Sequence, residues 1–319
     1  MKKALWVLFL AVGVYTVVVL RADLTRVGQA LGTIHPGFIP LFLALPLANY
    51  FFRFLKWHFF LRRIQVGIPV GESMTVFLSG FSMTVSPGHM GELIKCVFLR
   101  ERHGVPVACS SPVVVAERIT DFLSMVLLAV AGMILTGGHA ALAAAGAGVA
   151  AAALAILVLF CDQVWMPVAA VFSKLPILKK RKGGLENFRA SARILLDPAS
   201  MMVAVPLGMI GWGLEAMVLV VIAGSMGASL PPGAALLSHA AGTIAGAVSM
   251  IPGGLGLAEL TIDGILGGYI SPARAAVTTL VMRFCTLWFG VLLGLLSLAV
   301  LKRRKPPAKR TRLETASPV

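Results

Sequence analysis

The chain has 319 residues, of which 58% are hydrophobic and only 13% are charged. Several apolar runs reach the ~20 residues that a helix needs to cross a bilayer, so an all-α, polytopic integral membrane protein is expected. The formal net charge of +15 would suggest nucleic acid in a soluble protein, but here the basic residues gather between hydrophobic runs and at the tail. The positive-inside rule and anionic lipid headgroups explain that placement, and nucleic acid is excluded as a partner.

About six full spans are predicted, and the first is interpreted as an uncleaved span because no small-residue cleavage site follows it. The spans cover 4–20, 38–61, 112–136, 141–160, 201–226 and 272–301. The second span ends in a mixture of cations and aromatic residues that includes Arg53, Lys56 and Trp57. Such a mixture is typical of a membrane interface, where long cationic side chains reach back to water. This interpretation gives these residues no functional role.

Two further apolar segments are each interrupted by a proline–glycine turn, Pro87-Gly88 in the first and Pro252-Gly253-Gly254 in the second. The flanking half-length segments are 73–86 and 91–99 in the first case, and 231–251 and 255–270 in the second. Short helices joined in this way predict re-entrant hairpins that enter and leave the membrane on one face. The alternative is that either pair crosses the membrane fully, which would change the topology.

The two turns belong to stretches that repeat at one constant offset. Pro87, Gly88 and Gly91 correspond to Pro252, Gly253 and Gly256, and the same offset pairs Arg118 with Arg283. Repeat units at about 38–136 and 201–301 are therefore predicted, linked by a span and basic loop at 141–200. A basic, disordered tail is expected at 302–319. The alternative is a pair of ordinary kinks and a chance arginine match.

Loop charge predicts how the two units lie in the membrane. The basic loops after Leu61, around Arg100 and after Leu301 are expected in the cytoplasm, because cytoplasmic loops carry the excess of Lys and Arg. The loops at Gly137 and Ser229 carry no basic residue and are expected outside. The two units are then inverted relative to each other, and their turns meet near the middle of the bilayer around a central site.

Arg118 and Arg283 are the first candidates for a binding site. A charge inside a membrane span is costly unless it is paired or faces water. A guanidinium makes two parallel hydrogen bonds to a phosphate, so two arginines at equivalent repeat positions predict a phosphate clamp at one cavity. The alternative is structural ion pairing, in which Arg118 contacts Asp121 one turn on and Arg283 contacts a carboxylate of the other repeat.

Further candidates are charged residues that share a helix face. Glu92 and Lys95 are one turn apart, and Glu259 and Asp263 lie on one face of the second return helix. Paired carboxylates can bind a cation or relay protons. For Glu259 and Asp263, ion pairing with one of the two arginines is the favoured interpretation.

Glu117 and Asp121 complete the charged set of the span at 112–136. Glu215 stands alone in its span and is interpreted as a proton carrier or a structural partner, whereas His239 is interpreted as a packed side chain. The predicted hinge residues are Pro87, Gly88, Gly91, Pro252, Gly253, Gly254 and Gly256. No hydrolase, zinc or P-loop motif occurs, so no enzyme activity, metal site or cofactor is predicted.

Three motifs recur in order along the chain. They are Pro87-Gly-His-Met-Gly-Glu92 with Arg100, then Ala116-Glu-Arg-Ile-Thr-Asp121, and later Ile251-Pro-Gly-Gly-Leu-Gly-Leu-Ala-Glu259. Together they resemble the lysylphosphatidylglycerol synthase transmembrane family, also described as flippase-like, over roughly residues 5–301. In bifunctional members the resemblance implies a membrane portion that flips an aminoacylated lipid made by an attached soluble synthase domain. Because the chain ends at Val319, that domain is expected to be missing, and aminoacyl transfer is not expected.

The sequence therefore predicts a lipid translocase that moves an anionic or zwitterionic polar lipid between leaflets, with the lipid phosphate held by the intramembrane arginines. One alternative is an ion- or proton-coupled carrier of a small solute, and another is an accessory protein to lipid-linked glycosylation. The expected partners are membrane lipids, anionic headgroups at the basic loops and a separate lipid-modifying enzyme. The expected location is the inner (plasma) membrane, with the C-terminus in the cytoplasm.

Overall fold

The computed structural model describes residues 24–86, 91–137 and 184–303, and these residues form helices and connecting segments without a strand. The all-α prediction is confirmed. The predicted spans at 4–20 and 141–160, the turn residues Pro87 and Gly88, and the predicted tail from residue 304 onward lie outside the described residues.

Four long helices are apolar and long enough to cross a membrane. They are α3 (Ile39–Arg63, preceded by the short helix η1 at Pro36–Phe38), α6 (Val107–Leu135), α11 (Pro198–Ser225), and the continuous run of α14 (Pro272–Arg283), the π-helix η5 (Phe284–Trp288) and α15 (Phe289–Arg303). These helices coincide with the four predicted spans that fall within the described residues. Helices α11 and α14 both begin with a proline. Proline is favoured at the first position of a helix, because a backbone N–H there would have no acceptor within the helix.

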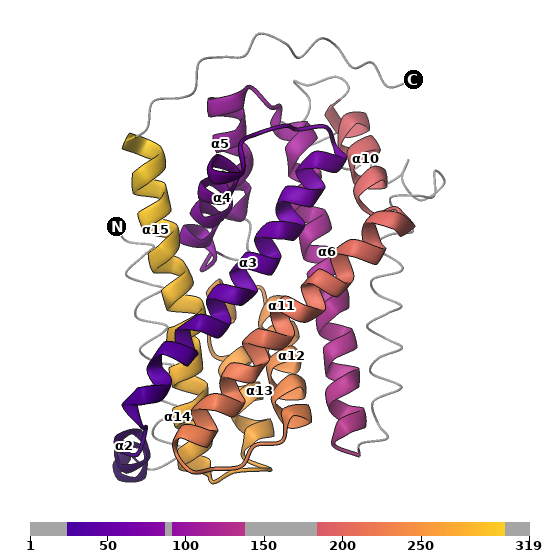
Figure 1. Ribbon diagram of the computed structural model, residues 1–319. Helices are drawn as coiled ribbons and strands as arrows, with labels where there is room; N and C mark the ends of the chain where they lie inside the picture. The colour runs from indigo at the N-terminus through magenta and orange to yellow at the C-terminus, as the bar shows by residue number, and fades with distance from the viewer. Residues whose placement is uncertain (1–23, 87–90, 138–183, 304–319) are drawn as a thin grey trace.

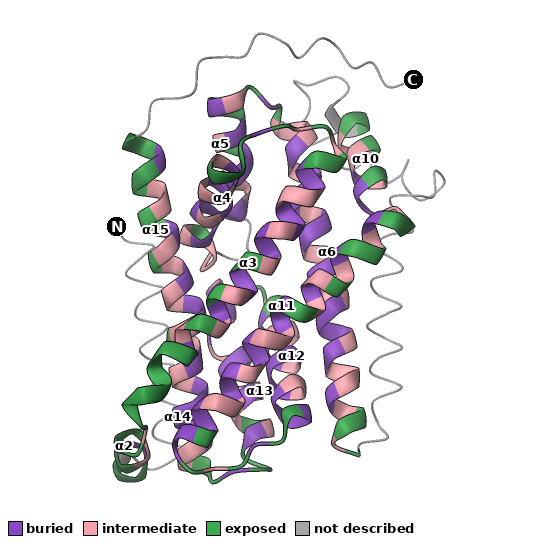
Figure 2. Cartoon of the chain, viewed as in Figure 1, coloured by how far each residue is buried: buried purple, intermediate pink, exposed green. Residues whose placement is uncertain are grey.

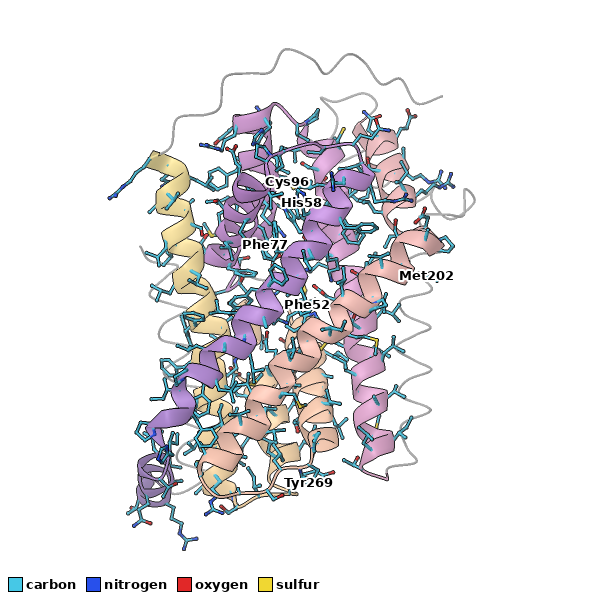
Figure 3. The ribbon with its side chains drawn as sticks, viewed as in Figure 1. Phe52, His58, Phe77, Cys96, Met202 and Tyr269 are labelled. Atoms are coloured by element: carbon cyan, nitrogen blue, oxygen red, sulfur yellow. The ribbon has the colours of Figure 1, made fainter. Side chains whose placement is uncertain are left out.

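Shorter helices form two pairs, one near each end of the molecule (Figure 1). The first pair is α4 (Val70–Ser79, continued by η2 at Gly80–Met83) and α5 (Ile94–His103), and the second is α12 (Pro232–Val248) and α13 (Leu257–Leu266), joined through η4 (Pro252–Gly254). In Figure 3, Phe77 of α4 and Cys96 of α5 lie in the upper part, and Tyr269 after α13 lies at the lower end. Re-entrant insertion of these pairs into a membrane stays a prediction.

The helix pairs contact the long helices in a reciprocal way. Helix α3 packs against α11, while α6 packs against α12 of the second pair and α15 packs against α4 and η2 of the first. Glycines allow both of the latter contacts: a Cβ on Gly132 of α6 would lie 2.6 Å from the carbonyl oxygen of Gly233, and one on Gly294 of α15 would meet the backbone of Ser82. Small residues are typical of close helix packing in membranes. An inverted repeat would produce this exchange of partners, and the repeat itself stays a prediction.

Helices α3, α5 and α15 end, and α11 begins, at one end of the molecule (Figure 1). Basic residues occupy the last turns of α3, α5 and α15 there. Arg63 at the end of α3 contacts Asp197 before α11 at 2.5 Å. Arg102 of α5 contacts Glu72 of α4 at 2.6 Å and donates to the carbonyl oxygen of Leu301 at 3.2 Å. These bonds connect the end of α3 with the start of α11, and the end of α5 with α4 and the end of α15, at what we call the basic end.

Two smaller helices complete the described part: α2 (Leu24–Gly32) at the opposite end and α10 (Gly184–Leu195) at the basic end. Buried residues lie along the inward faces of the helices, while many outward faces and helix ends are exposed (Figure 2). Several exposed residues on these faces are large and apolar, such as Met202 of α11 and Leu296 of α15. An apolar outer surface is what contact with lipid tails requires.

Candidate functional site

Six charged side chains from α3, α6 and the segment that begins α5 form a cluster that we call the buried ion-pair network. Its members are Lys56, Glu92, Lys95, Glu117, Arg118 and Asp121. Three cations face three carboxylates, so the cluster is formally neutral. All except the half-buried Arg118 are buried. Neutrality matters because an unpaired charge in this interior would be strongly unfavourable.

Arg118 and Asp121 lie where the network approaches α11. The Arg118 Nη2 atom is 3.1 Å from Asp121 Oδ2 and 3.4 Å from Glu92 Oε2. Asp121 also pairs with Lys56 and accepts a hydrogen bond of 2.9 Å from Trp212 Nε1. The structure thus contains the Arg118–Asp121 ion pair that the sequence analysis considered as an alternative to phosphate binding.

Lys95 lies at the centre of the network. Its Nζ atom is 2.7 Å from Glu117 Oε2 and 3.5 Å from Glu92 Oε2, and it lies 4.5 Å from the centre of the Trp57 ring. Lys95 provides the only ion pair of Glu117 within the described residues. The Glu92–Lys95 pairing predicted from helical spacing is present.

We expect Lys95→Met to lower the free energy of unfolding by about 3–5 kcal/mol, because it leaves the Glu117 carboxylate buried without its cation. Denaturant unfolding of the detergent-solubilised protein measures this loss. The double variant Lys95→Met, Glu117→Gln should recover most of the stability, whereas Lys302→Met on the exposed end of α15 should change little. A single variant as stable as the parent chain would show that the network does not need its cation.

A second ion pair connects α13 with α14. Arg283 Nε donates to Glu259 Oε1 at 2.6 Å, and Arg283 Nη2 donates to the carbonyl oxygen of Gly253 at 2.7 Å. The other oxygen of Glu259 accepts from the N–H of Gly256 at 2.7 Å, and Glu259 is fully buried. The expected pairing of Glu259 with Arg283 is therefore present. Asp263, one turn further along α13, is not among the residues that line the cavity described below.

The second Pro-Gly turn contains Gly253, whose carbonyl oxygen accepts a hydrogen bond from Arg283. Gly253, Gly254 and Gly256 all have positive φ, at +64°, +65° and +96°. Such backbone angles are readily accessible only to glycine. The π-helix η5 begins directly after Arg283, and short π-helical segments occur frequently at functional sites. The backbone is thus unusual both in the turn that contacts Arg283 and in the helical segment that follows it.

A cavity of about 100 Å³ lies between α3, α11, α12 and α14. One water molecule needs about 10–15 Å³ of such space, so the cavity can hold several waters or a small polar group. Its polar lining includes Arg53, Glu215, His239 and Arg283. Thr84, directly after η2 of the first helix pair, and Gly253 and Gly254 of the second turn also line it, so the two interrupted segments approach each other here.

Arg53 is the cavity residue that the sequence analysis misjudged. Its guanidinium lies 4.6 Å from the Trp212 ring centre and 5.1 Å from the Phe81 ring centre, and the residue is only 8% exposed. Among the described residues it has no ion pair and no hydrogen bond. Lys56, one turn on, is buried in the ion-pair network. The prediction that both reach back to interfacial water is therefore wrong.

The helical spacing of these residues could have indicated that they are buried. Tyr50, Arg53 and Lys56 recur every third residue and so share one face of α3. That face turns toward α11 and α6, where Trp212 and Asp121 provide partners. The interface interpretation considered only the distance of these residues from the end of the span.

The two arginines of the predicted clamp lie in different surroundings. Arg118 is not among the residues that line the cavity of Arg283; it pairs with Asp121, which accepts a hydrogen bond from the cavity residue Trp212. Arg53, and not Arg118, lines this cavity together with Arg283. Glu215 does not stand alone: its Oε1 atom is 4.0 Å from Nε2 of His239. Within residues 24–86, 91–137 and 184–303, no group of His, Cys, Asp and Glu side chains could hold a metal ion.

Comparison with known proteins agrees with the motifs in the sequence. The family model described as "Lysylphosphatidylglycerol synthase TM region" matches residues 6–294. A search of curated proteins found no match. The family match and the apolar helices point to a multi-pass membrane protein of lipid metabolism or transport. The match extends over most of the chain, and the chain therefore belongs to the lysylphosphatidylglycerol synthase TM region family.

Proposed function

We propose that this protein is a lipid translocase, which moves an anionic or zwitterionic phospholipid between leaflets and holds its phosphate in the cavity between Arg53 and Arg283. The observation that supports this proposal is the environment of the Arg53 side chain. This arginine is buried at the cavity wall between two aromatic rings and has no anionic partner among the described residues. A buried cation that no carboxylate contacts directly favours an anionic ligand.

Arg283 adds a second cation at the same cavity, although Glu259 and the Gly253 carbonyl already engage two of its nitrogen atoms. In this proposal Arg53, and not Arg118, is the partner of Arg283, while Arg118 belongs to the neutral network behind Trp212. A cavity of about 100 Å³ is suited to a phosphate and its immediate substituents. The acyl chains would remain in the bilayer against the apolar outer faces of the helices.

The same proposal assigns an orientation and partners. The basic end would lie on the cytoplasmic side of the plasma membrane, because positively charged segments are retained on that side and attract anionic headgroups. A separate lipid-modifying enzyme would supply the lipid. The proposed role is transport and includes no covalent step.

The proposal predicts a dependence on phosphate. The purified protein, reconstituted into liposomes, should accelerate the exchange between leaflets of acyl-labelled phosphatidylglycerol, measured by dithionite quenching. An acyl-labelled glucosyl-diacylglycerol, which lacks phosphate, should exchange at the rate of protein-free liposomes. Equal acceleration of both lipids would contradict phosphate recognition, and no acceleration of either would contradict the translocase assignment.

A further inference from the structure

Glu215 and His239 form the polar wall of the cavity beside Arg53, and the phosphate-binding role leaves both unused. Glu215 is 6% exposed, His239 is 3% exposed, and their Oε1 and Nε2 atoms are 4.0 Å apart. Both ring nitrogens of His239 lack a hydrogen bond within the described residues, and Glu215 also makes none there. Two buried titratable groups therefore face a polar cavity without a partner that fixes their protonation.

The charges around Glu215 come from every long helix packed near it. Helix α3 contributes Arg53 and the neutral Tyr50, whose hydroxyl donates to the backbone oxygen of Thr286. Helix α12 contributes His239, and α14 contributes Arg283 with its bound Glu259. Helix α6 contributes Asp121, whose charge belongs to the neutral ion-pair network.

These charges balance when the cavity holds no anion. Arg53 and Arg283 are positive, Glu259 and ionised Glu215 are negative, and His239 is neutral when unprotonated. A phosphodiester adds one negative charge to this set. In a buried site within a membrane an unbalanced charge is strongly unfavourable, so a compensating positive charge is needed.

We infer that the Glu215–His239 pair is a proton-binding site that takes up one proton from water when a phosphodiester enters the cavity. The inference rests on the proposed phosphate site and adds a second ligand to it. Protonation of the pair removes the negative charge of Glu215 or adds a positive charge on His239, and in either case it restores neutrality. Lipid binding and proton binding then favour each other, since thermodynamic coupling is reciprocal.

The sign of the pH dependence follows from this coupling. Because the protonated pair is the form that binds the anion more tightly, affinity should decrease as pH rises through the titration of the pair. A single linked proton weakens binding by at most about tenfold per pH unit. A phosphodiester does not titrate near neutral pH, so a proton taken up on binding has to be bound by the protein.

Dihexanoyl phosphatidylglycerol, kept below its micelle-forming concentration, is a suitable probe for isothermal titration calorimetry of the detergent-solubilised protein. Titrations in two buffers of different ionisation enthalpy give the number of protons taken up per bound lipid. We expect about one proton for the parent chain. Glu215→Gln mimics the protonated carboxyl, so this variant should bind without proton uptake and with an affinity independent of pH. The control His103→Gln, at the basic end, should behave like the parent chain.

The outcomes separate the two proposals. Binding by the parent chain without proton uptake would overturn the proton site and leave the phosphate site intact. Undiminished uptake in the Glu215→Gln variant, with an unchanged melting temperature, would also overturn it. Absence of any binding by the parent chain would overturn the phosphate site and the proton site together. The measurement on the parent chain is decisive even if the glutamine variant is not recovered in folded form.

Discussion

Replacing both cavity arginines, by Arg53→Ala and Arg283→Ala, should reduce the flipping of acyl-labelled phosphatidylglycerol to the rate of protein-free liposomes. Each alanine removes the charge and the donor fork that would hold the phosphate. Single Arg→Lys changes should give intermediate rates, because lysine keeps the charge but not the paired hydrogen bonds. Arg62→Ala, at an exposed position on the same helix as Arg53, should flip lipid at the parent rate.

The two arginines differ in their ion-pair partners, so their variants distinguish a loss of phosphate binding from a loss of stability. Arg53 makes no direct ion pair with a carboxylate among the described residues, so its loss breaks no salt bridge. Arg283→Ala instead leaves the buried Glu259 without its cation, which costs on the order of 3–5 kcal/mol. Adding Glu259→Gln should restore the melting temperature without restoring transport. Recovery of transport in that variant, or normal flipping by the double arginine variant, would show that the arginines serve only the fold.

Gly254→Ala should lower both the stability and the flipping rate. Gly254 has a φ of +65°, where an L-residue costs about 1–2 kcal/mol. An added Cβ would also lie 2.9 Å from the Cα of Gly246, so backbone atoms of η4 or α12 would have to move. The adjacent Gly253 carbonyl accepts from Arg283, and a shifted turn would therefore displace a cavity arginine.

Gly264→Ala in α13 is the matched control for this change. It makes the same substitution in a regular helix, where no heavy atom lies within 4 Å of the added Cβ. Alanine there should be neutral or stabilising by about 0.5–1 kcal/mol, because glycine loses more backbone freedom on folding. Melting curves and flipping rates of the two variants test the comparison. If the two variants transport lipid equally well, the turn has no role beyond connecting α12 with α13.

The class of protein and the features set by local chemistry could be predicted from the amino-acid sequence. Runs of apolar residues predicted the four described long helices, because the length of such a run reflects the thickness of the bilayer. The glycines after Pro252 predicted a turn that an ordinary residue could not adopt, and Gly253 and Gly254 have positive φ. Pairs one turn apart, such as Glu92 with Lys95, are in contact because helical spacing places them on one face.

Which charges share a cavity could not be predicted from the sequence, because it depends on how the helices pack against one another. The environment of Arg53 depends on Trp212 and that of Lys56 on Asp121, residues on helices far away in the sequence. Helical spacing gives the direction of a side chain about its own axis but does not identify the facing helix. Whether a cation near the end of a span is buried or reaches water depends on that contact. The packing of α3 against α11 and α6 therefore brought Arg53 to the cavity that Arg283 lines and left Arg118 in the neutral ion-pair network.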